Sequence, residues 1–250
     1  MRFGIGCIPT DYVHYPAWVR TAEAVGFHKV GTGDSSALWT DPFVTLAVAA
    51  SNSTRLRLTV TGTNPITRHP IAAAAAIESV QLASGGRCSY ALGSGDSAVA
   101  TIGSRRAPLA QVEEYGRAVQ ALCAGQTVSY QNQQLHLRWA TQPVPVFLCA
   151  DGPRTQFLAG QFADGAVLYN GITEDVVKSS VARIARGAAD ASRRVEDLQL
   201  WWTVVFHLTD DVEAGLDAVK FSLAGTANRA FRRGLADKDV PELSLIHISE

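Results

Sequence analysis

The sequence predicts an α/β protein built on a parallel β-sheet, and three observations support this. Strand-like and helix-like segments alternate about seven times along the chain. The predicted strands are almost continuously apolar, which is typical of strands with two buried faces. The chain has 250 residues, of which 47% are hydrophobic and 18% charged, enough to bury a large core. We predict a (β/α)₈ TIM barrel, truncated before its last strand, and an open doubly wound sheet is the alternative.

The first four strand–helix units follow from cap and breaker residues. Proline opens three of the four helices, and glycine follows the end of three, which are the usual start and stop signals. The strands are predicted at Arg2–Ile8, His28–Thr32, Leu56–Thr61 and Arg87–Leu92. The helices are predicted at Pro16–Val25, Pro42–Ser51, Pro70–Ala83 and Leu109–Ala124.

The second half begins with an interruption, at Thr127–Trp139. Two strand-like runs flank Gln131–Gln133 there, which predicts a hairpin insertion. Alternation then resumes, and the last helix starts with two acidic residues, which suit a helix N-terminus. The remaining strands are predicted at Val144–Ala150, Ala166–Tyr169 and Leu198–Leu208. The remaining helices are predicted at Thr155–Ala163, Glu174–Ala191 and Asp210–Leu223.

The end of the chain is treated separately. Residues 243–250 read LSLIHISE, which resembles the translation of a transposase adapter from sequencing libraries. We expect these residues to be non-native and the natural gene to continue beyond about Pro241. Because no composition shift marks a linker, residues 1–242 are predicted to form one domain, incomplete at its C-terminus.

Composition argues against several functional classes. The formal net charge is -1, from 22 basic and 23 acidic residues, so neither nucleic acid nor a membrane surface is an expected partner. There is no apolar run long enough for a transmembrane helix and no signal-peptide pattern, which predicts a cytoplasmic protein. The four cysteines lack a CxxC and the six histidines lack ligand spacing, so no metal site is expected.

In a barrel of this kind the site lies in the loops after the strands. Asp34 follows the second strand and could bind a ligand or tune a proton transfer, or simply cap a turn. The third loop, Thr61–Pro70, holds two prolines and a glycine, which favours a rigid ligand shelf over an ordinary turn. Within it, Arg68 is expected to brace the loop or bind an anion.

Three further loops have small or helix-opening residues. Gly93–Ser97 would let a planar ligand approach the backbone, with Asp96 pointing into the mouth or capping the next helix. Asp151–Thr155 and Tyr169–Thr173 could hold a phosphate on free N–H groups or act only as helix caps.

Taken together, these loops resemble the luciferase-like superfamily, and most of all the methylenetetrahydromethanopterin reductases and bacterial relatives that use coenzyme F420. The stretch Gly62–Pro70 is the most specific, followed by Ser84–Arg87 and Gly93–Asp96. The resemblance implies an oxidoreductase that binds F420, or FMN as the alternative, and is a homodimer when full length.

The resemblance also implies roles for particular residues. Asp34 and Asp96 would be catalytic, and a non-proline cis peptide would join Thr61 to Gly62. Ser35 stands where related enzymes often have histidine, which leaves Asp96 as the better acid/base candidate. Residues implied in cofactor binding are Asp34, Ser35, Trp39, Thr61, Gly62, Thr63, Asn64, Gly93, Ser94, Gly95, Asp96, Asp151, Gly152, Pro153, Tyr169, Asn170 and Gly171.

Three functions remain open at this point. The first is an F420-dependent oxidoreductase that transfers hydride between the deazaflavin and a small organic substrate. The second is an FMN-dependent monooxygenase of the same fold. The third, from a different class, is a non-catalytic flavin-binding protein or an inactive fragment.

Overall fold

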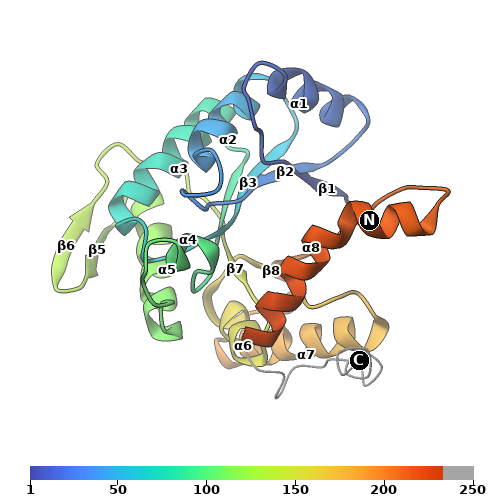
Figure 1. Cartoon of the computed structure of the whole chain (residues 1–250). Coiled ribbons are helices and arrows are strands. Elements are labelled where there is room, and N and C mark those ends of the chain that lie inside the picture. The colour runs from blue at the N-terminus through green and yellow to red at the C-terminus, as the bar shows by residue number, and fades with distance from the viewer. Residues whose placement is uncertain (233–250) are drawn as a thin grey trace.

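A seven-stranded parallel sheet forms the centre of the protein, and a computed structural model describes residues 1–232 (Figure 1). Its strands run in the order β1-β2-β3-β4-β7-β8-β9. Because this is also the order along the chain, the sheet has no switch point at which a doubly wound sheet would reverse. The sheet is curled and forms part of a barrel. The strands are β1 (Gly4–Gly6), β2 (Lys29–Thr32), β3 (Arg57–Thr63), β4 (Cys88–Leu92), β7 (Val146–Cys149), β8 (Gly165–Leu168) and β9 (Gln199–Trp202).

Most of the helices pack against the outer face of this sheet, whereas the described side chains of the last helix are mostly exposed. Six of the predicted helices have boundaries within two residues of those observed, because proline and glycine mark their ends. The helices are α1 (Tyr15–Ala24), α2 (Pro42–Ser51), α3 (Pro70–Ser84), α4 (Ser97–Ala100), α5 (Leu109–Cys123), α6 (Pro153–Phe162), α7 (Glu174–Asp190) and α8 (Val212–Arg232), with a 3₁₀ turn at Val195–Asp197.

The caps explain why the boundaries were predictable. The carboxylate of Asp41 accepts hydrogen bonds from the backbone N–H groups of Phe43 and Val44, at 2.9 and 3.2 Å. At the other end of the following helix, α3, Gly85 adopts the left-handed conformation with φ 66°, which glycine tolerates best.

The predicted hairpin is confirmed. Strands β5 (Thr127–Tyr130) and β6 (Gln133–His136) pair antiparallel in a separate two-stranded sheet. The two turn residues, Gln131 and Asn132, have φ of 48° and 62°, as expected for a type I′ turn.

Three predictions of secondary structure were wrong. The last helix was predicted to end at Leu223, but α8 continues to Arg232. The last strand ends at Trp202, six residues earlier than predicted, because its backbone pairing with β8 runs only from Gln199 to Trp202. Apolar residues beyond it, including Phe206 and Leu208, are exposed rather than buried in the sheet. The short helix α4 was not predicted, since four residues are too few to show a periodicity.

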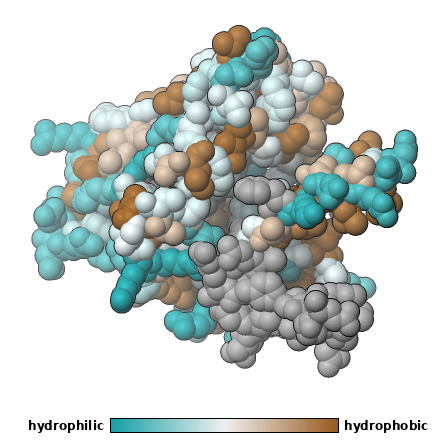
Figure 2. Space-filling view, viewed as in Figure 1, coloured by the Kyte–Doolittle hydropathy of each residue, from teal (hydrophilic) through white to brown (hydrophobic). Residues whose placement is uncertain are grey.

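The core lies mainly between the sheet and the helices, and a smaller cluster lines the inside of the curl. That inner cluster contains Ala91, Phe147 and Val167, with Trp201 packed against it. On the face shown in Figure 2, hydrophobic and hydrophilic residues are interspersed outside the grey atoms. None of the helices in residues 1–232 is both long and apolar enough to cross a membrane. The predicted non-native segment, residues 243–250, lies outside the described residues.

Candidate functional site

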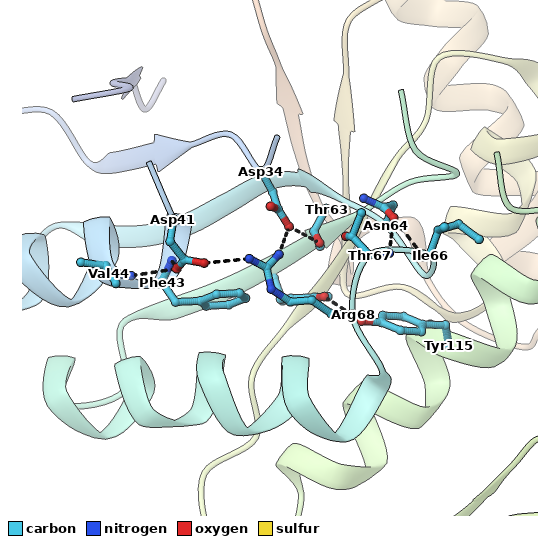
Figure 3. Close-up of polar contacts among 11 residues, drawn as sticks. Asp34, Asp41, Phe43, Val44, Thr63, Asn64, Ile66, Thr67, Arg68 and Tyr115 are labelled. Carbon is cyan, nitrogen blue, oxygen red and sulfur yellow. Dashed lines mark hydrogen bonds and ion pairs between the residues drawn. The ribbon is translucent and has the colours of Figure 1, made fainter. Parts of the chain in front are cut away.

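The loops after β2 and β3 meet at Asp34. Its side chain is fully buried, and its Oδ2 atom accepts a 2.8 Å hydrogen bond from the Thr63 hydroxyl. The same oxygen is ion-paired with the guanidinium of Arg68 (Figure 3). Asp34 therefore joins the loop after β2 to the end of β3 and the loop that follows it.

Arg68 connects three elements of the site. Its second guanidinium nitrogen lies 2.8 Å from Asp41 Oδ2, and its guanidinium carbon lies 5.0 Å from the centre of the Phe43 ring. Burial by itself would lower the pKa of Arg68, but its hydrogen bonds and charge interactions with Asp34 and Asp41 outweigh burial and raise the pKa. The bracing role expected for Arg68 is confirmed.

The predicted cis peptide between Thr61 and Gly62 is wrong, since none of the peptide bonds of the described residues is cis. The irregularity itself is present: the register between β3 and β4 shifts between Val60 and Thr63. Gly62 absorbs this shift with φ of 89°, a conformation that strongly favours glycine. The bulge is thus made by a glycine in a trans chain.

Glycines bring the backbone of the β4 loop close to β3 and β7. The N–H of Gly93 donates a 2.9 Å hydrogen bond to the carbonyl of Thr63. A Cβ at Gly93 would lie 3.2 Å from Cys149 Cβ, and one at Gly62 would lie 3.8 Å from the sulfur of the same cysteine. Gly62, Gly93 and Cys149 therefore form a closely packed stretch of backbone at the carboxyl ends of three neighbouring strands, which we call the glycine floor.

Asp96 stands at the edge of this floor. Its carboxylate is 42% exposed and lies 2.5 Å from a guanidinium nitrogen of Arg106, ten residues along the same loop. A pocket of about 450 Å³ opens beside it, lined also by Val99, Ala100, Ser104 and Arg105. Asp34 is buried, whereas the Asp96 carboxylate is partly exposed to solvent.

The predicted residues after β7 and β8 form a second group. Asp151 Oδ1 accepts a 2.9 Å hydrogen bond from the N–H of Tyr169, which joins the two loops. Asn170 donates through Nδ2 to Ser180 Oγ at 2.9 Å. Gly152 is the N-cap of α6, Pro153 occupies its first turn, and Gly171 has φ of 98°. These residues lie together at the N-terminus of α6.

Several buried polar atoms in these loops have no hydrogen-bond partner among the described residues. They are Asp34 Oδ1, Ser35 Oγ, Asn64 Nδ2, Thr67 Oγ1 and Asn170 Oδ1. An unpaired buried polar atom costs about 1–3 kcal/mol, and each of these atoms keeps the capacity for a further hydrogen bond. Trp39 lies at the rim, 37% exposed, with its ring against Gly33.

Sequence reasoning overlooked two parts of this site. Arg106 pairs with Asp96 from ten residues away, and Cys149 lies under the glycines. Charge pairing across a loop has no periodic signal, and an apolar strand gives no reason to single out its last residue. Within residues 1–232 there is no group of three acidic, histidine or cysteine side chains that could hold a metal ion.

Comparisons with known proteins agree with this architecture. A model of the luciferase-like monooxygenase family matches residues 8–244. A 5,10-methylenetetrahydromethanopterin reductase from Methanolobus tindarius is 31% identical over 248 residues, covering 93% of this chain and 74% of that protein. An F420-dependent glucose-6-phosphate dehydrogenase from Beutenbergia cavernae is 27% identical over 238 residues, covering 85% of this chain and 68% of the dehydrogenase.

The fold comparison gives the same answer. The structure of a coenzyme F420-dependent tetrahydromethanopterin reductase from Methanopyrus kandleri matches with a TM-score of 0.77 at 22% identity, covering 89% of this chain and 71% of that chain. At this identity the match concerns the fold, whereas the family match spans nearly the whole sequence. The chain therefore belongs to the luciferase-like monooxygenase family and is an enzyme of the oxidoreductase class.

Proposed function

We propose that this enzyme is an F420-dependent oxidoreductase that transfers hydride between the deazaflavin and a small organic substrate. The observation that carries the proposal is the glycine floor beside a buried carboxylate, at the carboxyl ends of the strands. Gly62 and Gly93 keep this stretch of backbone free of side chains: a Cβ at Gly93 would lie 3.2 Å from Cys149 Cβ, and Gly62 has φ of 89°. The similarity to F420-dependent relatives supports the choice of cofactor.

The unpaired polar atoms fit such a cofactor. Asp34 Oδ1 can accept a hydrogen bond and Asn64 Nδ2 can donate one, so the two loops can bind the polar edge of a heterocycle. Trp39 would cover the ring from the rim. When bound, F420 would supply the hydride chemistry, and the protein supplies orientation and excludes water.

The second group of residues suits the charged tail of the cofactor. The first turn of α6 follows Gly152, where free N–H groups and the helix dipole favour an anion. Asn170 Oδ1 has no partner among the described residues, so it can accept a hydrogen bond from a hydroxyl. We assign the loops at Asp151–Pro153 and Tyr169–Gly171 to the chain and phosphate of the cofactor.

Proton exchange is assigned to Asp96. Its carboxylate pairs with Arg106 and is partly exposed, so it is the carboxylate of the site that both solvent and a substrate in the neighbouring pocket could reach. Asp34, which is buried and ion-paired with Arg68, acts as a hydrogen-bond acceptor. The substrate would enter over the pocket beside Asp96.

Cofactor titration tests the proposal. The purified protein is mixed with F420 and separately with FMN, and binding is followed by the absorbance and fluorescence of each cofactor. We expect F420 to bind more tightly. Gly93→Val should abolish binding, because a Cβ at this residue would already lie 3.2 Å from Cys149 Cβ. Gly225→Ala, at an exposed position in a helix, should leave binding unchanged. Preferential FMN binding would contradict the F420 assignment.

The second candidate is an FMN-dependent monooxygenase, and the family description itself favours it. The same floor would serve a flavin, so the cofactor preference separates the two. Binding of neither cofactor would indicate the third possibility, a protein without this catalytic function. A homodimer remains a prediction, which light scattering after size-exclusion chromatography checks.

A further inference from the structure

We infer that Arg68 is a positioning residue: it holds the Asp34 carboxylate so that Asp34 Oδ1 is presented as an anionic acceptor to a hydrogen-bond donor of the bound ligand. The inference rests on the proposed function only in identifying that ligand as the cofactor or its substrate. It goes beyond the bracing role expected for Arg68 because it names the Asp34 carboxylate as the group that Arg68 positions.

The two oxygens of Asp34 have opposite environments. Oδ2 is paired with Arg68 and accepts the hydrogen bond of Thr63 at 2.8 Å. Oδ1 is buried and has no partner among the described residues. Since both available donors act on one oxygen, the side chain cannot rotate without losing them. The other oxygen is thereby held in a single direction.

Arg68 is itself held from three sides. One guanidinium nitrogen pairs with Asp34, another lies 2.8 Å from Asp41, and the Phe43 ring lies 5.0 Å from the guanidinium carbon. The other oxygen of Asp41 caps α2. The position of the Asp34 carboxylate is therefore tied to a helix N-terminus, which is a rigid element.

Stability alone does not explain this arrangement. A buried ion pair is weak evidence for stability, because well-packed apolar residues often replace one at no cost. An unpaired carboxylate oxygen adds a desolvation cost. That cost is recovered when a ligand donates an N–H or O–H group to Oδ1. The geometry therefore fits a group kept ready for binding.

Substitutions at Arg68 and at Asp41 should have different effects on the Asp34 carboxylate, which allows a test. Arg68 is shared by two carboxylates, so Arg68→Gln leaves the buried Asp34 charge without a cation. Asp41→Asn keeps a residue that caps helices well but removes the competing carboxylate, so Arg68 interacts with Asp34 alone. Arg68→Lys retains the charge, but a lysine ammonium lacks the planar guanidinium that pairs with both Asp34 and Asp41.

The first measurement is thermal unfolding of the cofactor-free protein. We expect Arg68→Gln to lower the melting temperature, because it leaves the buried Asp34 carboxylate without its cation. Asp41→Asn should lower it less, because Arg68 stays paired with Asp34. The double variant Arg68→Gln, Asp34→Asn should recover most of the loss.

The second measurement is cofactor affinity, by titration with F420 and with FMN. We expect Arg68→Gln to weaken binding of the preferred cofactor about tenfold or more, with partial rescue by Arg68→Lys. Arg138→Gln, at an exposed arginine beyond the hairpin, is the matched control and should leave affinity unchanged.

Two results would overturn the inference. One is equal destabilisation by Arg68→Gln with and without Asp34→Asn, and the other is unchanged affinity in Arg68→Gln. If the wild-type protein binds neither cofactor, the proposed function fails, and the comparison of the single and double variants in thermal unfolding then decides whether Arg68 holds the Asp34 carboxylate.

Discussion

Lys29 is a buried lysine whose charge is unfavourably placed. It lies on β2 inside the curl of the sheet and is 7% exposed. Its Nζ atom is 4.1 Å from the centre of the Trp201 ring and 4.6 Å from that of Phe147, and no acidic residue of the described range forms an ion pair with it. Burial, and then repulsion from Arg57, lower the pKa of Lys29 from 10.5 to about 7.

This pKa change sets the size of the expected effect. Because a tenfold change in proton affinity is worth about 1.4 kcal/mol, holding the proton on Lys29 in the folded state costs about 5 kcal/mol at most. The two cation–π contacts stabilise the charged form of Lys29 by roughly 1–2 kcal/mol. Lys29→Met removes the charge while its unbranched side chain can still pack against the rings. We therefore expect Lys29→Met to increase the free energy of unfolding near pH 7 by about 2–4 kcal/mol.

The pH dependence follows from the same numbers. Between about pH 7 and pH 10.5 the unfolded chain holds the proton of Lys29 and the folded protein has lost it, so stability of the wild type should rise with pH. Below about pH 7 both states are protonated and the penalty is constant. Lys29→Met should remove this rise.

Urea unfolding followed by circular dichroism at several pH values measures both effects. Lys178→Met is the control, since Lys178 is exposed and pairs with Glu174 on the same helix at 2.5 Å. A Lys29→Met protein that is less stable than the wild type, with the rise in stability with pH unchanged, would refute the reasoning.

Three further predictions concern packing and backbone geometry. Arg87→Lys should lower the free energy of unfolding in urea by about 1–3 kcal/mol, because this guanidinium donates to four backbone carbonyls and a hydroxyl between α2, β3 and α3. An unchanged midpoint would show that these hydrogen bonds do not stabilise the fold. Gly187→Ala should destabilise by roughly 1–3 kcal/mol, since its Cβ would overlap the carbonyl of Phe157 in α6, whereas Gly225→Ala, in open space, should be neutral or stabilising. Gly95→Ala should lower the melting temperature and weaken cofactor binding, because Gly95 has φ of 96° and a Cβ there would overlap Val99 Cγ2; an unchanged affinity would show that the loop does not contact the ligand.

Much of the fold could be predicted because its signals are local. Pro42 and Pro70 open helices, Gly85 ends one, and the apolar runs mark strands buried on both faces. The last strand could not be bounded in this way, since its length depends on pairing with β8. The peptide bond before Gly62 was also predicted wrongly, because a glycine at positive φ makes the same bulge in a trans chain.

The candidate site also has features that could be predicted from the sequence and features that could not. The sequence by itself determined which loops hold Asp34, Asp96 and the glycines, since each follows a recognisable strand. Only the tertiary structure decided that Arg68 pairs with Asp34 and that Arg106 pairs with Asp96. Such pairings depend on where separate loops meet, and no spacing along the chain encodes that distance. The physical reason is that secondary structure follows from neighbours in sequence, whereas charge compensation in a buried site follows from neighbours in space.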